Sequence, residues 1–135
     1  MSSMKNTYAG DLRTKAIHAR SGNEIVTDAP VDNQGKGEAF SPTDLASVSL
    51  SACMLTIMGQ VATREGIDMR GVTTDITKVM ESNPRRILEI HVNFHWPEID
   101  LTDKQIKLLK RAARTCPVAL SLHPDIKQVV EFNLD

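Results

Sequence analysis

The chain is poor in aromatic residues, in cysteine and in excess charge of either sign. Only 4% of its 135 residues are aromatic, so its core has to be filled by leucine, isoleucine, valine, methionine and alanine. The net charge is −1 and no basic run occurs, which argues against nucleic acid as a partner. An apolar content of 41% with 24% charged residues is typical of a globular protein, and the length suits one domain over residues 1–135.

The two cysteines, Cys53 and Cys116, are too few for a disulfide-rich secreted scaffold. The first eight residues also lack the apolar segment that a secretory signal needs. Both absences predict a cytoplasmic protein, in which a pair of cysteines is either reactive or inert and is not a static cross-link. No glycine-rich phosphate-binding pattern occurs, so we expect no nucleotide cofactor.

The four histidines form no recognisable metal-binding pattern with each other or with the cysteines. His91 and His95 lie on one face of a predicted strand, but at strand rise they are roughly 13 Å apart. One ion cannot bridge that distance, and we expect no metal site.

The segment from Leu45 to Thr63 has no charged residue and approaches the length of a membrane-spanning helix. Serine, threonine and glutamine interrupt it, and large apolar side chains are sparse. The pattern therefore favours a helix buried inside the protein over a membrane span.

Local signals place the helices and strands. We expect a hairpin over residues 8–27 that turns at residues 21–23, and then a loop over residues 28–40. Ser41 and Asp44 form a predicted capping box for a helix from Pro42 to about Glu65, with Gly66 as its stop.

A second hairpin is expected over residues 71–96, and its second arm alternates between apolar and polar residues. The predicted inner face consists of Leu88, Ile90, Val92, Phe94 and Trp96. Thr102 and Gln105 cap a second long helix, which Pro117 ends or kinks, and a final strand is expected over residues 126–134. These elements predict an α+β fold with an antiparallel sheet and two main helices.

Each cysteine allows two interpretations. Cys53 lies about three turns into the first helix, where a thiol is either a buried, inert apolar side chain or, beside a cation or hydrogen-bond donor, a reactive thiolate. Cys116 either closes the apolar stripe of its helix or caps the turn that starts at Pro117. In the second case the free N–H groups of the helix start would lower the pKa of Cys116.

The segment Phe40-Ser-Pro-Thr-Asp-Leu45, followed by Ser51-Ala-Cys53, resembles the signature helix of the OsmC/Ohr family of osmotically inducible and organic hydroperoxide resistance proteins. The Cys116-Pro117 pair and the order of elements along the whole chain resemble the same family. The resemblance implies an OsmC-like fold of antiparallel sheets wrapped around a central buried helix. It also implies an intertwined homodimer with active sites at the subunit interface.

The resemblance further implies a thiol peroxidase that reduces small hydrophobic organic hydroperoxides. Cys53 would be the peroxidatic cysteine and Cys116 the resolving cysteine, and an external dithiol of lipoyl type would regenerate both. Arg20, in an Arg-x-Gly turn, would be the arginine that stabilises the Cys53 thiolate and orients the peroxide. A pocket lined by Leu50, Met54 and Ile57 would suit such a substrate.

One position departs from the family pattern. The glutamate that follows the helix-start proline, and pairs with the arginine, is replaced here by Thr43, which leaves Glu38 and Asp44 as candidate partners of Arg20. The alternative function is a non-catalytic dimer that binds a small apolar ligand at its interface. Acyl transfer or hydrolysis by a cysteine is a third reading, and no histidine near either cysteine in the sequence supports it.

Overall fold

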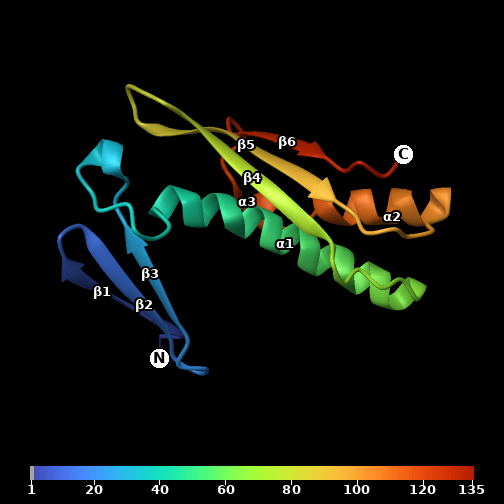
Figure 1. The fold of residues 1–135 in the computed structure, drawn as a ribbon, viewed down its shortest axis with the longest axis horizontal. Helices are drawn as coiled ribbons and strands as arrows, with labels where there is room; N and C mark the ends of the chain where they lie inside the picture. Colours follow the sequence, from blue (N-terminus) through green and yellow to red (C-terminus); the bar gives the residue numbers. More distant parts are fainter. Residues whose placement is uncertain (1) are drawn as a thin grey trace. The chain divides into compact units, whose positions relative to one another are not determined.

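The computed structural model describes residues 2–135 and divides the chain into two compact units. The first unit ends at Ala46 and the second begins at Ser47. Figure 1 shows the elements of both units. The expectation of one domain over residues 1–135 stays a prediction.

The first unit is a three-stranded antiparallel sheet of β1 (Met4–Gly10), β2 (Arg13–His18) and β3 (Glu24–Asp28), followed by the short 3-10 helix η1 (Val31–Asn33). The predicted hairpin turn at residues 21–23 is confirmed. The sequence analysis missed a second turn at Asp11 and Leu12, whose positive φ angles separate β1 from β2. The Gly10-Asp11 pair was the available signal for that turn.

The second unit contains most of helix α1 (Pro42–Glu65) and the sheet β4 (Thr73–Glu81), β5 (Arg86–His95) and β6 (Lys127–Glu131). Helices α2 (Asp103–Arg114) and α3 (Pro117–Ser121) lie between β5 and β6 in the sequence. Strand β6 pairs parallel to β5, whereas the sequence analysis expected antiparallel pairing throughout. The chain can return in the same direction because the two helices carry it back along the sheet.

Both predicted capping boxes are confirmed, which explains why both long helices begin where the sequence indicates. The Ser41 hydroxyl accepts a hydrogen bond from the Asp44 N–H, and the Asp44 carboxylate accepts one from the Ser41 N–H, each at 3.0 Å. Thr102 and Gln105 form the same reciprocal pair at α2. Gly66 ends α1 with a φ of 70°, a conformation that glycine adopts without steric cost.

One prediction on the inner face of β5 is wrong. Leu88 is exposed, whereas Ile87 packs against the core. The cause is a bulge: Val79 pairs with Glu89 and Met80 with Ile87, so Leu88 has no opposite residue. One extra residue in a strand moves the side chains beyond it to the other face of the sheet.

The core of the second unit joins α1, the sheet and α2. Aliphatic residues and methionine fill most of it, as predicted, and three of the chain's five aromatic residues also lie there. Phe94 stacks on Trp96 and on Phe132, with ring centroids 6.0 and 5.3 Å apart, and the Trp96 indole donates a hydrogen bond to the Phe132 carbonyl.

Helix α1 is only partly covered by its own chain. It is long and apolar enough to cross a membrane by length and composition alone, a test that the core helix of a globular protein also meets. Its inner face is buried, but Ala52, Thr56 and Gln60 are exposed. The expected burial is therefore found on one face of the helix.

Candidate active site

The two cysteines come together in the second unit although 62 residues separate them in the sequence. Cys53 lies in α1 and is partly buried, and Cys116 is fully buried. The Val118 N–H donates a hydrogen bond to the Cys53 sulfur at 3.4 Å. The Cys53 side chain is also a direct neighbour of the Cys116 thiol.

Cys116 occupies the N-cap position of α3, and Pro117 is the first residue of that helix. The sequence predicted this position as one of two alternatives, and Pro117 favours it because the fixed φ of proline suits the first helical turn. The thiol lies near the N–H groups of Val118 and Ala119.

The expected lowering of the Cys116 pKa is wrong. Burial is the largest influence and raises the pKa, because the thiolate loses its hydration. The Ala119 and Val118 N–H groups act in the opposite direction, and the neighbouring Cys53 raises the pKa further. Both alternatives are therefore partly right: Cys116 caps a helix, and it also closes the apolar core.

Helix α3 holds the two cysteines together and is itself held by β6. The Gln128 side-chain amide donates a hydrogen bond to the Ala119 carbonyl at 2.9 Å. Because Ala119 belongs to the turn that contacts Cys53, Gln128 fixes the position of the donor at the Cys53 sulfur. No local pattern predicts this contact, because α3 and β6 are separate elements of the chain.

Arg20 is exposed in the turn between β2 and β3. It belongs to the first unit and Cys53 to the second, so its action on Cys53 stays a prediction. The carboxylates proposed as its partners are engaged elsewhere: Asp44 accepts from the Ser41 N–H, and Glu38 pairs with Arg13. Thr43 lies 3.3 Å from the Ser41 hydroxyl.

An arginine–carboxylate cluster that the sequence did not predict lies in the first unit and consists of Arg13, Asp28 and Glu38. The Arg13 guanidinium donates to both oxygens of Asp28, at 2.7 and 2.8 Å, and to Glu38 at 3.2 Å. Hydrogen bonding to Arg13 lowers the pKa of Asp28 although burial opposes this, and the pKa of Arg13 is raised in turn. Asp28 is only 1% exposed.

Two of the three residues expected to line an apolar substrate pocket are fully buried within the second unit. Leu50 and Met54 are fully buried in the core, so they cannot line an open pocket, and Ile57 is partly buried against the same core. Within residues 2–135, no group of three or more histidine, cysteine or acidic side chains could hold a metal ion. His91 and His95 instead pair separately, with Glu89 and Asp75.

The chain is similar in sequence and structure to known proteins of one family. The family model for OsmC-like protein matches residues 35–131. No curated protein matches the chain. A crystal structure from Psychrobacter arcticus 273-4, described as an osmotic stress induced and detoxification response protein, is 56% identical, with a TM-score of 0.94 over 98% of this chain and 96% of that one.

Two more distant structures share the fold. An organic hydroperoxide resistance protein OsmC from Legionella pneumophila is 14% identical, with a TM-score of 0.74, over 99% of this chain and 98% of that one. An organic hydroperoxide resistance protein from Elizabethkingia anophelis is 18% identical, with a TM-score of 0.64, over 98% of each chain. By its α+β fold and by the match of the family model, the chain belongs to the OsmC-like family.

Proposed function

We propose that this protein is a thiol peroxidase that reduces organic hydroperoxides, with Cys53 as the peroxidatic and Cys116 as the resolving cysteine. The proposal rests on one contact: the Cys53 sulfur accepts a hydrogen bond from Val118, in the first turn of the helix α3 that Cys116 caps. The contact places the resolving candidate beside the sulfur that would attack the peroxide, and thiolates are the nucleophilic form of cysteine.

The proposed reaction has two steps on the protein. The Cys53 thiolate attacks the outer peroxide oxygen, the O–O bond breaks, and the alkoxide takes a proton to leave as an alcohol, with Cys53 as sulfenic acid. Cys116 then attacks the Cys53 sulfur, and the hydroxyl of the sulfenic acid leaves with a proton as water. An external dithiol reduces the resulting disulfide and is itself oxidised.

The raised pKa of Cys116 suits the resolving role. At neutral pH this thiol remains protonated, so it does not compete with Cys53 for the peroxide. Because its side chain adjoins Cys53, we expect that a short movement of α3 brings the two sulfurs into bonding distance. The alternative of a non-catalytic ligand-binding dimer gains no support from the single chain, in which Leu50 and Met54 are buried.

The proposed reaction also needs an arginine beside the Cys53–Cys116 pair. Arg20 is the proposed arginine that orients the peroxide, and Arg13 is the competing candidate because it carries the arginine–carboxylate cluster. We further propose a cytoplasmic homodimer, a small hydrophobic hydroperoxide as substrate and a dithiol, of lipoyl type, as reductant.

Steady-state turnover of cumene hydroperoxide with dihydrolipoamide tests this function. We expect that Cys53→Ser abolishes turnover. Cys116→Ser should lack sustained turnover. Its Cys53 should be oxidised to sulfinic acid by a second peroxide or to sulfonic acid by a third, visible by mass spectrometry as two or three added oxygens. Ser121→Ala, an exposed change on the same short helix, serves as control and should keep full activity. Unchanged turnover in Cys53→Ser would refute the proposal.

A further inference from the structure

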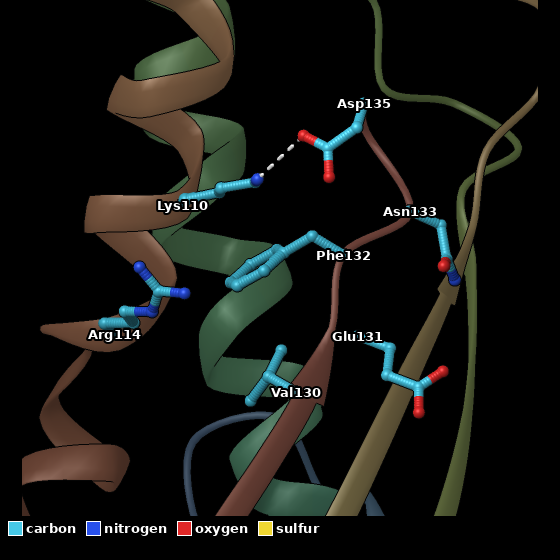
Figure 2. A pocket seen from close by; sticks show the side chains of 7 residues that line it. All are labelled: Lys110, Arg114, Val130, Glu131, Phe132, Asn133 and Asp135. Atoms are coloured by element: carbon cyan, nitrogen blue, oxygen red, sulfur yellow. Dashed lines mark hydrogen bonds and ion pairs between the residues drawn. The ribbon is translucent and has the colours of Figure 1, made fainter.

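A pocket lies between the last turns of α2 and the segment formed by the end of β6 and the residues after it. It has a volume of about 640 Å³, and no residue of the proposed redox pair contributes to it. Its lining consists of Lys110, Arg114, Val130, Glu131, Phe132, Asn133 and Asp135. Figure 2 shows Lys110 and Arg114 extending from α2 toward the Phe132 ring.

The two cations are arranged around one aromatic ring. The Lys110 ammonium lies 5.8 Å and the Arg114 guanidinium carbon 5.3 Å from the centroid of Phe132, within the range of cation–π contacts. Phe132 is buried and stacked on Phe94, so it forms a rigid floor for both cations. The ring contacts therefore place both cations beside the same face of the pocket.

One of the two cations already binds a carboxylate. Lys110 pairs with Asp135 at 3.3 Å, and Asp135 is 92% exposed at the end of the sequence. Figure 2 shows the Asp135 carboxylate facing Lys110 across the opening of the pocket. A carboxylate that is held by a single exposed ion pair is easily displaced, because such pairs contribute little free energy.

The other cation has no anionic partner. Within residues 2–135, no carboxylate pairs with Arg114, whose guanidinium offers a planar set of donors that matches a carboxylate. The remaining polar groups do not neutralise it. Asn133 donates to the side chain of Asn93 and to the Phe94 carbonyl, and Glu131 points away from α2 in Figure 2.

From this arrangement we propose that the pocket binds a small organic carboxylate, which pairs with Arg114 and displaces Asp135 from Lys110. The Asp135 side chain then acts as an internal competitor. The carboxylate class follows from the group that already occupies the Lys110 position. This site is independent of the proposed peroxidase chemistry.

The single tryptophan supplies a reporter for this site. The Trp96 indole N–H donates to the carbonyl of Phe132 at 2.6 Å, so its NMR signal responds to movement of the pocket floor. The test titrates succinate into 15N-labelled protein at constant ionic strength. We expect a saturable shift in the wild type, tighter binding in Asp135→Asn, and a Kd raised at least about tenfold in Arg114→Gln.

Arg111→Gln is the matched control, since Arg111 is exposed in the same helical turn but does not line the pocket. It should leave the Kd unchanged. Saturation in Asp135→Asn alone would still support the site, with Asp135 as the dominant competitor. The proposal would be overturned if the NMR shift did not saturate in the wild type or in Asp135→Asn. It would also be overturned if Arg111→Gln and Arg114→Gln weakened succinate binding equally. Tighter binding of inorganic phosphate than of succinate would overturn the carboxylate class.

Discussion

At the scale of single residues, the chemistry of this protein depends on two thiols in unlike surroundings. Cys53 is partly accessible and receives an N–H donor, whereas Cys116 is fully buried and its pKa is raised. The sequence predicted the two positions but not the direction of the Cys116 shift. Helix-cap donors and burial act against each other there, and only the packing of the core shows that burial is larger.

The arginine that serves Cys53 can be identified by paired substitutions. We expect Arg20→Gln to lower kcat/KM for cumene hydroperoxide by roughly tenfold or more, because the lost cation no longer stabilises developing negative charge. Arg13→Gln is the comparison, with circular dichroism to confirm that each variant is folded. A full loss with Arg13→Gln and none with Arg20→Gln would transfer the role to Arg13.

The Arg13–Asp28 pair predicts a specific acid sensitivity. The folded-state pKa of Asp28 lies below its ordinary value of about 3.9. The pair's contribution to stability is therefore fully present above about pH 4, and it is lost as the pH falls through the lowered pKa. Asp28→Asn removes this titration.

Urea unfolding of the wild type and of Asp28→Asn between pH 7 and pH 2.5 measures this contribution. The variant should be less stable at pH 7, and the difference between the two proteins should shrink below about pH 4. A difference that stays constant over the whole range would contradict the assignment.

At the scale of elements, the parts that the sequence predicts well are those with local causes. Both long helices start at reciprocal side-chain caps, and Gly66 ends the first one. The predictions that were wrong depend on contacts between residues that are far apart in the sequence. The bulge that exposes Leu88 depends on how β5 pairs with β4. The parallel pairing of β6 with β5 depends on the direction in which the chain emerges from α2 and α3. The Arg13–Asp28 pair likewise requires that β2 and β3 are adjacent.

The link between α3 and β6 gives a prediction at this scale. Gln128→Ala removes the hydrogen bond to the Ala119 carbonyl, which should lower the free energy of unfolding by about 1 kcal/mol. Because α3 then moves more freely, the Val118 N–H donates less well to the Cys53 sulfur. We therefore expect slower oxidation of Cys53 by peroxide at neutral pH, measured by stopped-flow fluorescence.

Lys127→Ala is the control for Gln128→Ala, because Lys127 is exposed on the same strand. Lys127→Ala should change neither the free energy of unfolding nor the rate of Cys53 oxidation. A loss of stability in Gln128→Ala with an unchanged rate of Cys53 oxidation would show that Gln128 has a structural role only.

At the scale of the whole molecule, the single chain leaves much apolar surface uncovered. Large apolar side chains on the first unit are exposed, among them Met4, Tyr8, Val31 and Phe40. Helix α1, which has no charged residue between Leu45 and Thr63, is also exposed along one face, at Ala52, Thr56 and Gln60. Apolar surface of this extent is typical of a protein–protein interface, which supports the proposed homodimer.

Light scattering after size exclusion tests the homodimer. The wild type should have twice the mass of the chain. Thr56→Lys should be monomeric, because the interface would bury an unpaired charge. Glu98→Lys, in an exposed loop, should remain dimeric. A monomeric wild type, or a dimer that tolerates Thr56→Lys, would count against an interface formed by α1.

Cys53 and Cys116 are proposed to form one redox pair, which a single-turnover experiment can detect. Reduced protein receives one equivalent of cumene hydroperoxide and is analysed by mass spectrometry without reductant. We expect one cumyl alcohol per chain and a loss of two hydrogens through a Cys53–Cys116 disulfide within one chain. Unreacted thiols, or a disulfide between two Cys53 residues of different chains, would contradict it.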